Sequence, residues 1–161
     1  MCGIVGFTGE HQAAPILLDG LAKLEYRGYD SAGIAVRDGD ADVEVIKAKG
    51  RLKVLAEKTN DGETVKGTCG IGHTRWATHG EPSDVNSHPH SNGNATISVV
   101  HNGIIENYMK LREWLTSKGY EFLSETDTEV IPNLVDYYYE GDLFEAVVKA
   151  TSKLEGSFAI G

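Results

Sequence analysis

Residues 1–8 read M-C-G-I-V-G-F-T, a cysteine directly behind the initiator methionine and then a short apolar run. Residues 3–8 are typical of a short buried strand. Because Cys2 has a small side chain, removal of Met1 is expected to leave it as the first residue. That residue then carries a thiol and a free α-amine, a nucleophile and a general base on adjacent carbons. The pattern favours amino-terminal nucleophile chemistry, although a small second residue also occurs in proteins that have no such chemistry.

The rest of the chain predicts a mixture of helices and strands. Asp38-Gly39-Asp40 indicates a hairpin turn, Asp142 is a plausible helix N-cap, and Pro132 is acceptable only within the first turn of a helix. Several antiparallel-type strands with helices predict an α+β layered fold. Helices are expected over 12–25, 51–59, 105–118, 126–139 and 142–154, and further strands over 33–37, 42–48, 68–74, 96–101 and 157–161.

Composition narrows the classes of protein. The 161 residues are enough for one domain with a core, and the net charge of −9 argues against nucleic acid or an anionic membrane as partner. The N-terminus lacks the basic region of a signal peptide, and two cysteines make no disulfide framework, so the cytoplasm is the expected compartment. The apolar stretch 157–161 begins a strand, so we expect residues 1–161 to be part of a longer polypeptide.

Two segments carry residues suited to attack on a carbonyl. Asn102-Gly103 follows an apolar run, and an Asn amide with a Gly N–H forms a workable oxyanion hole. The alternative is a plain Asn-Gly turn. Residues 72–80 read G-H-T-R-W-A-T-H-G, in which Arg75 offers a planar fork for a carboxylate, Trp76 can wall a pocket, and Thr78 and His79 add polar partners. The alternative there is a surface ion pair for Arg75 and a core position for Trp76.

Two charged positions each have two interpretations, and at Asp127 the local sequence favours the structural one. Arg27 lies in the segment L-E-Y-R-G-Y-D-S-A-G at 24–33, where it either supports the site or pairs with Asp30. Asp127, in S-E-T-D-T-E-V at 124–130, either binds a substrate ammonium or caps a helix.

Histidines and cysteines suggest two competing functions. Five of the six histidines lie between residues 73 and 101, but His88-Pro89-His90 lacks the spacing of a tetrahedral zinc site. A metal-dependent hydrolase therefore remains an alternative, although no metal ligand is expected. A thiol-redox or regulatory domain using Cys2 and Cys69 is a second alternative, but Cys69 is expected to pack as a small apolar residue.

Five segments together resemble the class II glutamine amidotransferases, which are N-terminal-nucleophile hydrolases. They are C-G-I-V-G at 2–6, L-E-Y-R-G-Y-D-S-A-G at 24–33, H-T-R-W-A-T-H-G at 73–80, H-N-G-I-I-E-N at 101–107 and S-E-T-D-T-E at 124–129. The order of the five motifs matches the amino-sugar-forming branch of the family. The resemblance covers essentially the whole chain.

The resemblance implies a role for each matching residue. Cys2 would be the nucleophile with its α-amine as base, and Asn102 and Gly103 the oxyanion hole. Arg75 would hold the glutamine α-carboxylate and Asp127 its α-ammonium. The remaining positions would form a closing substrate loop, with Trp76 also gating the ammonia path, or support the nucleophile: Trp76, Thr78, His79 and Arg27.

It also implies the architecture and the reaction. The fold would be a four-layer α-β-β-α sandwich of two antiparallel sheets. L-Glutamine would be hydrolysed through a thioester, without a cofactor or metal. The ammonia would pass to fructose 6-phosphate, giving glucosamine 6-phosphate, on sugar-isomerase-type synthase domains that follow this one in the same polypeptide. The full-length enzyme would be a homodimer with neither nucleic acid nor membrane as partner.

Overall fold

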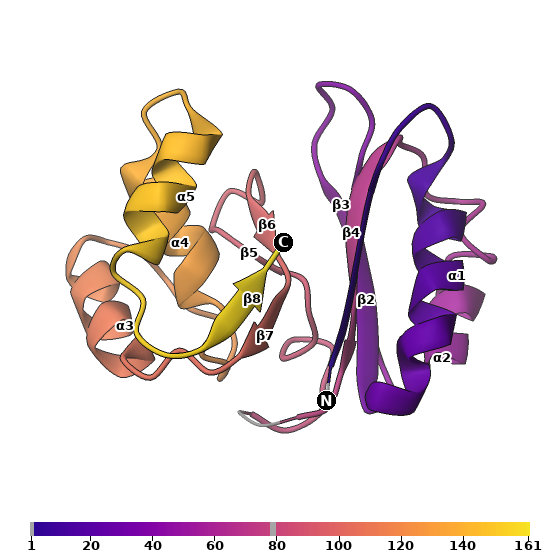
Figure 1. Cartoon of the computed structure of the whole chain (residues 1–161), viewed down its shortest axis with the longest axis horizontal. Helices are drawn as coiled ribbons and strands as arrows, with labels where there is room; N and C mark the ends of the chain where they lie inside the picture. The colour runs from indigo at the N-terminus through magenta and orange to yellow at the C-terminus, as the bar shows by residue number, and fades with distance from the viewer. Residues whose placement is uncertain (1, 78–79) are drawn as a thin grey trace.

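A computed structural model describes residues 2–77 and 80–161, which form four layers (Figure 1). Two inner layers of strands lie between two outer layers of helices. This arrangement confirms the predicted α-β-β-α order. One outer layer contains α1 (Ala13–Leu24) and α2 (Leu52–Lys58), and the other contains α3 (Tyr108–Ser117), α4 (Val130–Tyr138) and α5 (Leu143–Thr151).

The first inner layer is one antiparallel sheet in the order β1–β4–β2–β3. A predicted hairpin joins its last two strands, with Gly39 in the left-handed region at φ +54°. A short 3₁₀ helix, η1 (Glu25–Arg27), precedes β2. The strands are β1 (Gly3–Thr8), β2 (Ser31–Arg37), β3 (Glu44–Lys49) and β4 (Cys69–Arg75).

The second inner layer consists of two strand pairs rather than the single predicted sheet. The strand predicted over 96–101 is divided at Val100, because its first half pairs with β5 and its second half with β8. Val100 and Gly161 exchange two backbone hydrogen bonds of 3.0 Å, which continue the β7–β8 ladder to this point. The strands are β5 (His90–Ser91), β6 (Ser98–Val99), β7 (His101–Gly103) and β8 (Phe158–Ile160); β5 was not predicted.

Local sequence signals agree with the structure at the starts of α4 and α5. The Asp142 side chain accepts the Glu145 N–H at 3.0 Å, as expected of an N-cap, and Pro132 is the third residue of α4. The helix predicted over 105–118 begins instead at Tyr108. The preceding backbone is bound elsewhere, since Ile105 N–H donates to Asp127 and Glu106 N–H to the Glu155 carbonyl.

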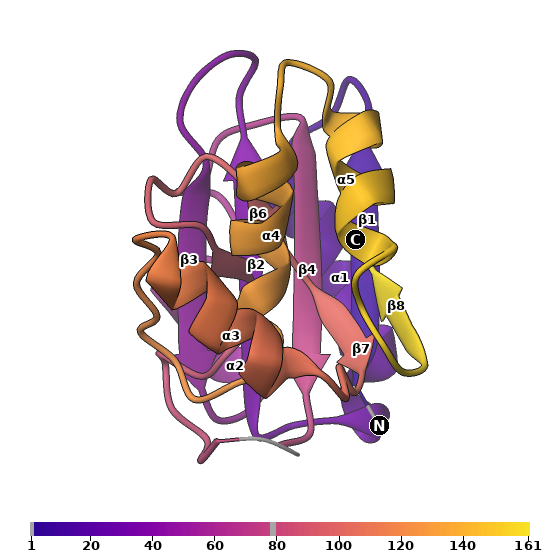
Figure 2. The same ribbon diagram turned by 90° about the vertical axis from the view of Figure 1, so that its left-hand side faces the viewer.

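Two apolar cores lie outside a polar middle layer. One core packs α1 and α2 on the first sheet, and the other packs α3, α4 and α5 on the short strands. Figure 2 shows α4 in front of β6, with β7 and β8 visible beside the helices. Between the two strand layers lie four buried histidines: His73, His88, His90 and His101. Among the described residues, no helix has the length and apolar character needed to span a bilayer.

Candidate active site

The antiparallel pairing of β1 with β4 places Cys2 beside the segment that follows β4. Gly3 is opposite Thr74, so Cys2 lies where the chain leaves β4 at Arg75. The Cys2 sulfur accepts the Trp76 N–H at 3.2 Å and lies 3.5 Å from the Trp76 carbonyl oxygen. The expected nucleophile and the expected substrate loop are therefore in contact.

Asn102 reaches the same place from β7. Its Nδ2 donates to the Cys2 carbonyl at 3.1 Å across 100 residues of sequence. Gly103 has φ +112°, and a Cβ there would lie 2.2 Å from the Ser157 carbonyl oxygen, so only glycine fits. Both residues lie in a strand paired with β8, so the plain Asn-Gly turn is wrong.

Arg75 is buried at the end of β4, with 3 % of its surface exposed. Its Nη2 donates to the Gly80 carbonyl at 3.1 Å. Burial lowers the pKa of Arg75, while electrostatic interaction with Asp30, and to a smaller extent with Cys2 and Asp127, raises it. The prediction of a surface ion pair for Arg75 is therefore wrong. The positive charge of Arg75 instead acts on the positions of both Cys2 and Asp127.

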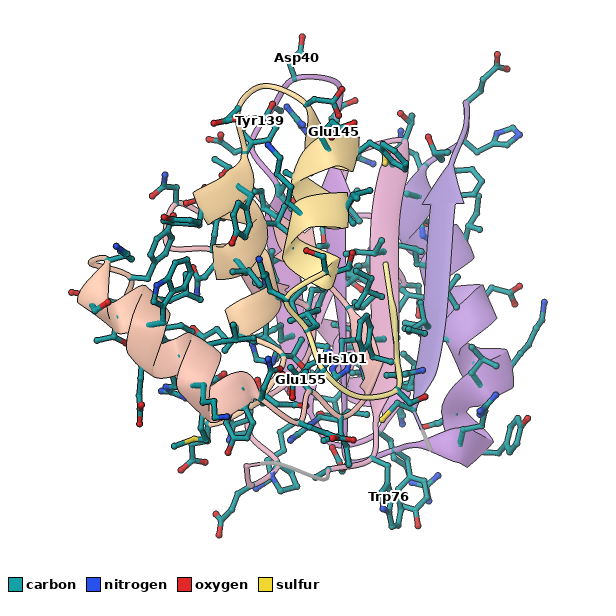
Figure 3. All side chains as sticks on the ribbon, turned by 60° about the vertical axis from the view of Figure 1, so that its left-hand side comes forward. Asp40, Trp76, His101, Tyr139, Glu145 and Glu155 are labelled. Carbon is teal, nitrogen blue, oxygen red and sulfur yellow. The ribbon has the colours of Figure 1, made fainter. Side chains whose placement is uncertain are left out.

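Trp76 is 48 % exposed, so it is not a core residue. Its ring meets Tyr29 edge to face with centroids 5.3 Å apart. Figure 3 shows Trp76 projecting from the molecule below the strands, whereas His101 lies in the interior. Thr78 and His79, the other two predicted members of this loop, lie outside the described residues.

Asp127 is buried and does not cap α4, so the capping interpretation is wrong. Its Oδ2 accepts the Ile105 N–H at 2.8 Å, which ties it to the segment after Asn102-Gly103. Glu129 is the N-cap residue of α4, and its carboxylate accepts the backbone N–H groups of Leu123 and Ser124. Asp127 thus presents a buried carboxylate near Arg75.

The turn containing Arg27 packs against the backbone of the substrate loop. Arg27 ends η1, and a Cβ on the next residue, Gly28, would lie 2.8 Å from the Arg75 carbonyl carbon and 2.9 Å from the Trp76 nitrogen. Asp30 was not predicted as a site residue. Its carboxylate accepts from the Ser31 hydroxyl and the Ala77 N–H, which fixes the backbone after Trp76.

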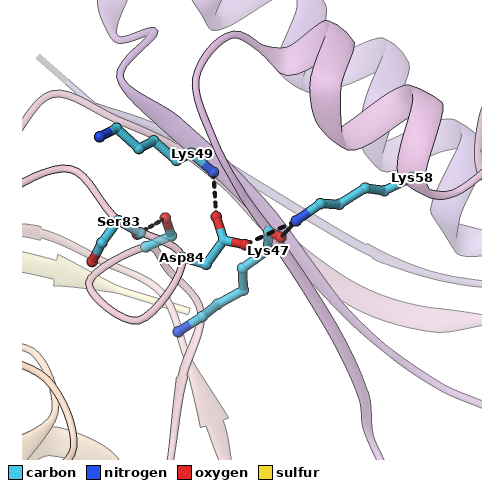
Figure 4. Close-up of polar contacts among 6 residues, drawn as sticks. Lys47, Lys49, Lys58, Ser83 and Asp84 are labelled. Carbon is cyan, nitrogen blue, oxygen red and sulfur yellow. Dashed lines mark hydrogen bonds and ion pairs between the residues drawn. The ribbon is translucent and has the colours of Figure 1, made fainter.

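A polar cluster anchors the far end of this loop to β3 (Figure 4). The two Asp84 carboxylate oxygens accept from the Lys49 N–H at 2.6 Å and the Lys58 ammonium at 2.9 Å. The Lys58 hydrogen bond, with that from Lys49, lowers the pKa of Asp84. Lys47 donates to the Val85 carbonyl at 3.0 Å, and burial lowers its pKa to about 8. Segment 83–87 is thereby tied to the first sheet.

The histidines and cysteines do not form the alternative sites. No group of three or more His, Cys, Asp or Glu side chains within residues 2–77 and 80–161 is arranged to hold a metal ion. The imidazoles instead stack, with His73 and His88 centroids 4.0 Å apart. Cys69 is exposed, so its predicted apolar packing is wrong. It pairs with Thr8 at the opposite end of β1 from Cys2, about 20 Å away at strand rise, so the two thiols form no redox pair.

His73 is the site residue that the sequence interpretation missed. It lies on β4 two residues before Arg75, so both side chains leave the same face of the sheet. Its Nε2 lies 2.8 Å from Asn102 Oδ1 and 3.1 Å from the His101 carbonyl oxygen. Strand alternation from Arg75 was the signal available to find it.

Two clefts lie away from Cys2 and Asn102. One, of about 780 Å³, is lined by residues that include Lys47, Asp84 and Glu129. The other, of about 670 Å³, lies between the first sheet and helices α4 and α5. Neither cleft is lined by Cys2 or Asn102.

Comparison with known proteins gives consistent likenesses. A family described as glutamine amidotransferase domain matches residues 73–161. The chain is 68 % identical over its whole length to a Clostridium tetani protein named glutamine–fructose-6-phosphate aminotransferase (isomerizing), and covers 26 % of it. A protein of that name from Thermus thermophilus is 52 % identical over 99 % of the chain, which covers 26 % of it. The chain spans about a quarter of the length of these relatives.

A solved structure shares the fold. Glutamine phosphoribosylpyrophosphate amidotransferase from B. subtilis superimposes with a TM-score of 0.84 at 29 % identity, over 99 % of this chain and 34 % of that one. This likeness agrees with the predicted α+β sandwich of antiparallel strands.

Proposed function

The chain belongs to the family of glutamine amidotransferase domains, and from this premise we propose that it hydrolyses L-glutamine to glutamate and ammonia with Cys2 as nucleophile. One observation carries the proposal: the Cys2 sulfur contacts the Trp76 N–H while the Cys2 carbonyl accepts from Asn102. These three residues come from three separate parts of the chain. Their meeting supports a nucleophile placed between a substrate loop and an oxyanion donor.

The first half of the reaction forms a thioester. With Met1 removed, the Cys2 α-amine takes the thiol proton, directly or through water, and the sulfur attacks the side-chain amide carbon of glutamine. A C–S bond forms, and the carbonyl oxygen becomes an oxyanion. The α-ammonium then protonates the amide nitrogen, the C–N bond breaks, and ammonia leaves.

The second half restores the enzyme. The free α-amine takes a proton from water, and the oxygen of that water attacks the thioester carbon. The C–S bond breaks, the proton returns to sulfur, and glutamate leaves. The overall reaction consumes one water molecule. No electrons are gained or lost, so no redox partner is needed.

Two buried charges would select the substrate by length. Arg75 is suited to the α-carboxylate of glutamine, and Asp127 to its α-ammonium. Clamping both groups fixes the distance from the α-carbon to the sulfur. Asparagine, one methylene shorter, would leave its amide carbon short of Cys2. We place Trp76, with Thr78 and His79, in the loop that closes on the bound amino acid, and Arg27 in its support.

The whole protein is proposed to use the ammonia. Relatives of about four times this length are named for glutamine and fructose 6-phosphate. We propose that synthase domains following residue 161 transfer the ammonia to fructose 6-phosphate, and that Trp76 gates its path. A homodimer is the assembly implied by the resemblance, and sedimentation of the full-length protein tests it.

Ammonia release from glutamine tests the proposal. Cys2→Ala should abolish release but keep glutamine binding, measured by calorimetry. Cys69→Ala is the matched control: it removes the other thiol, at the far end of β4, and should leave release unchanged. A chelator should have no effect. Ammonia release by Cys2→Ala, or its loss with chelator, would refute the proposal.

A second variant tests the α-amine. An alanine inserted between Met1 and Cys2 leaves alanine first after methionine removal, so the Cys2 nitrogen becomes an amide and is no longer a base. Turnover should fall to the level of Cys2→Ala, with intact mass confirming the new first residue. Full activity in that variant would exclude the α-amine as the base.

A further inference from the structure

An asparagine oxyanion donor works in only one of its two amide orientations. Rotation of the Asn102 amide by 180° would exchange its oxygen and its NH₂ group, and would turn an acceptor toward the reacting carbonyl. Asn102 is half-buried at the end of β7. The hydrogen-bond partners of the Asn102 amide therefore determine which end of it faces the nucleophile.

His73 makes the contact that can decide it. Its Nε2 lies 3.1 Å from the His101 carbonyl oxygen, and a carbonyl only accepts, so Nε2 carries the proton. The same N–H faces the Asn102 amide at 2.8 Å, so the atom turned toward His73 must be an acceptor, Oδ1. The Nδ2 group is thereby turned toward Cys2, whose carbonyl accepts it at 3.1 Å.

The surroundings hold His73 in this state. It is fully buried on β4, with β1 and β2 on either side, and its ring stacks on His88 at 4.0 Å and 12°. Burial lowers its pKa to about 4, so the ring is neutral and has one N–H. Its Nδ1 has no hydrogen-bond partner within residues 2–77 and 80–161, consistent with the proton residing on Nε2.

We propose that His73 is a positioning residue: it fixes the Asn102 amide so that the Asn102 NH₂ group faces the oxyanion formed on glutamine when the Cys2 sulfur attacks. It does not touch substrate, and the inference rests on the proposed function. Without the Nε2–H donor the amide keeps only the Cys2 carbonyl as a contact that favours the productive orientation, so that orientation is less populated and kcat falls while KM stays nearly constant. The loss is bounded by that of Asn102→Ala, roughly 10²–10³-fold for one oxyanion donor.

Two amide substitutions give a matched test. In His73→Gln the side-chain NH₂ reaches the Nε2 position, whereas in His73→Asn it reaches only the Nδ1 position and cannot contact Asn102. His73→Asn should lower kcat at least tenfold with KM within about twofold, and His73→Gln should recover most of kcat. In the Asn102→Ala background His73→Asn should cause no further loss.

Two readouts separate positioning from damage and from failure of the proposed function. Alkylation of Cys2 by iodoacetamide forms no oxyanion, so its rate should be equal in all folded variants. The Asn102 side-chain amide resonances, assigned by their loss in Asn102→Ala, should show contact with Cys2 protons in the wild type and in His73→Gln, but not in His73→Asn. This readout needs no activity, so a wild type that releases no ammonia overturns the proposed function alone.

The positioning proposal would be overturned by three results. They are equal kcat in the two His73 variants, additive losses with Asn102→Ala, or an unchanged Asn102 resonance pattern in His73→Asn. If His73→Asn fails to fold, His73→Gln still decides, since a kcat as low as that of Asn102→Ala would contradict the proposal.

Discussion

The Asp127 carboxylate accepts a backbone hydrogen bond and also carries a negative charge. One substitution separates the effects of the hydrogen bond from those of the charge. Asparagine keeps an oxygen that can accept the Ile105 N–H now held at 2.8 Å, but loses the negative charge proposed to bind the glutamine ammonium. Asp127→Asn should therefore raise KM for glutamine at least tenfold, with a smaller change in kcat and an unchanged melting temperature. Steady-state kinetics measure KM and kcat, and thermal unfolding measures the melting temperature.

A surface aspartate provides the control for that charge. Asp19 lies on α1, 71 % exposed, in an ion pair with Lys23. Asp19→Asn makes the same chemical change away from the site and should leave KM unaltered. A wild-type KM in Asp127→Asn would show that the ammonium is held elsewhere.

Asn102 should show the opposite kinetic signature. Its amide is proposed to bind an oxygen that becomes charged only in the transition state, so Asn102→Ala should lower kcat by roughly 10²–10³-fold with little change in KM. The same kinetic assay distinguishes the two variants, because Asp127→Asn should mainly change KM and Asn102→Ala should mainly change kcat. Unchanged kcat in Asn102→Ala would remove this residue from the oxyanion hole.

At the scale of elements, the η1 turn supports the substrate loop through backbone contact. A Cβ at Gly28 would lie 2.8–2.9 Å from backbone atoms of Arg75 and Trp76, which cannot rotate away as a side chain can. Gly28 is extended at φ −169°, so alanine there meets a steric obstacle and no dihedral strain. Gly28→Ala should displace Arg75 and Trp76 and lower kcat/KM for glutamine at least tenfold.

Gly6→Ala is the matched control for that substitution. A Cβ at Gly6, on β1, meets nothing within 4 Å, so its kinetics should equal those of the wild type. Equal kinetics in Gly28→Ala would mean that the loop adjusts without cost.

The N-terminus of α5 offers a test of stability alone. The Asp142 carboxylate accepts the Glu145 N–H at 3.0 Å on an exposed part of the helix. Asp142→Ala should lower the free energy of unfolding by about 1 kcal/mol, and Asp142→Asn, which also caps well, by much less. Urea unfolding with a constant slope measures the difference. Kinetic constants should not change, and equal losses in both variants would exclude the cap as the cause.

At the scale of the whole molecule, the buried histidines make stability depend on pH. Burial lowers the pKa of His73 to about 4 and holds those of His88 and His90 well below 6.5. Below pH 6.5 the unfolded chain binds protons that the folded chain does not, so the free energy of unfolding decreases as pH falls through this range. For His73 alone the change down to its folded pKa amounts to about 3 kcal/mol.

Urea midpoints at pH 7, 6 and 5 test this dependence. The midpoint should fall with each step, and His73→Gln should reduce the fall because one titrating group is gone. His11→Gln is the control, since His11 is exposed and should leave the dependence unchanged. Equal midpoints at pH 7 and 5 would contradict the prediction.

Local patterns in the sequence were sufficient for most elements. Asp142 precedes a helix it can cap, Pro132 is acceptable near a helix start, and Gly39 permits the turn between two apolar runs. These features act within a few residues, so their physics is the same in any fold. The motifs around Cys2 and Asn102 likewise indicated the family before any contact was known.

Other features depend on partners that are distant in the sequence. Asp127 could cap a helix or bind elsewhere, and only the approach of Ile105, 22 residues away, determined that it does not cap. Val100 divides a predicted strand because different segments pair with its two halves. Cys69, the first residue of β4, pairs with Thr8 of a strand distant in the sequence and is exposed there.

The sequence by itself determined the helices, the strands of the first sheet and the residue types available for amide chemistry, because periodicity and capping are short-range. The tertiary structure alone decided that His73 contacts Asn102 across 29 residues and that Asn102 contacts Cys2 across 100. Each of these hydrogen bonds depends on the relative placement of two strand layers. That placement depends on contacts between segments far apart in the chain, such as those of His73 and Asn102, which no local pattern specifies.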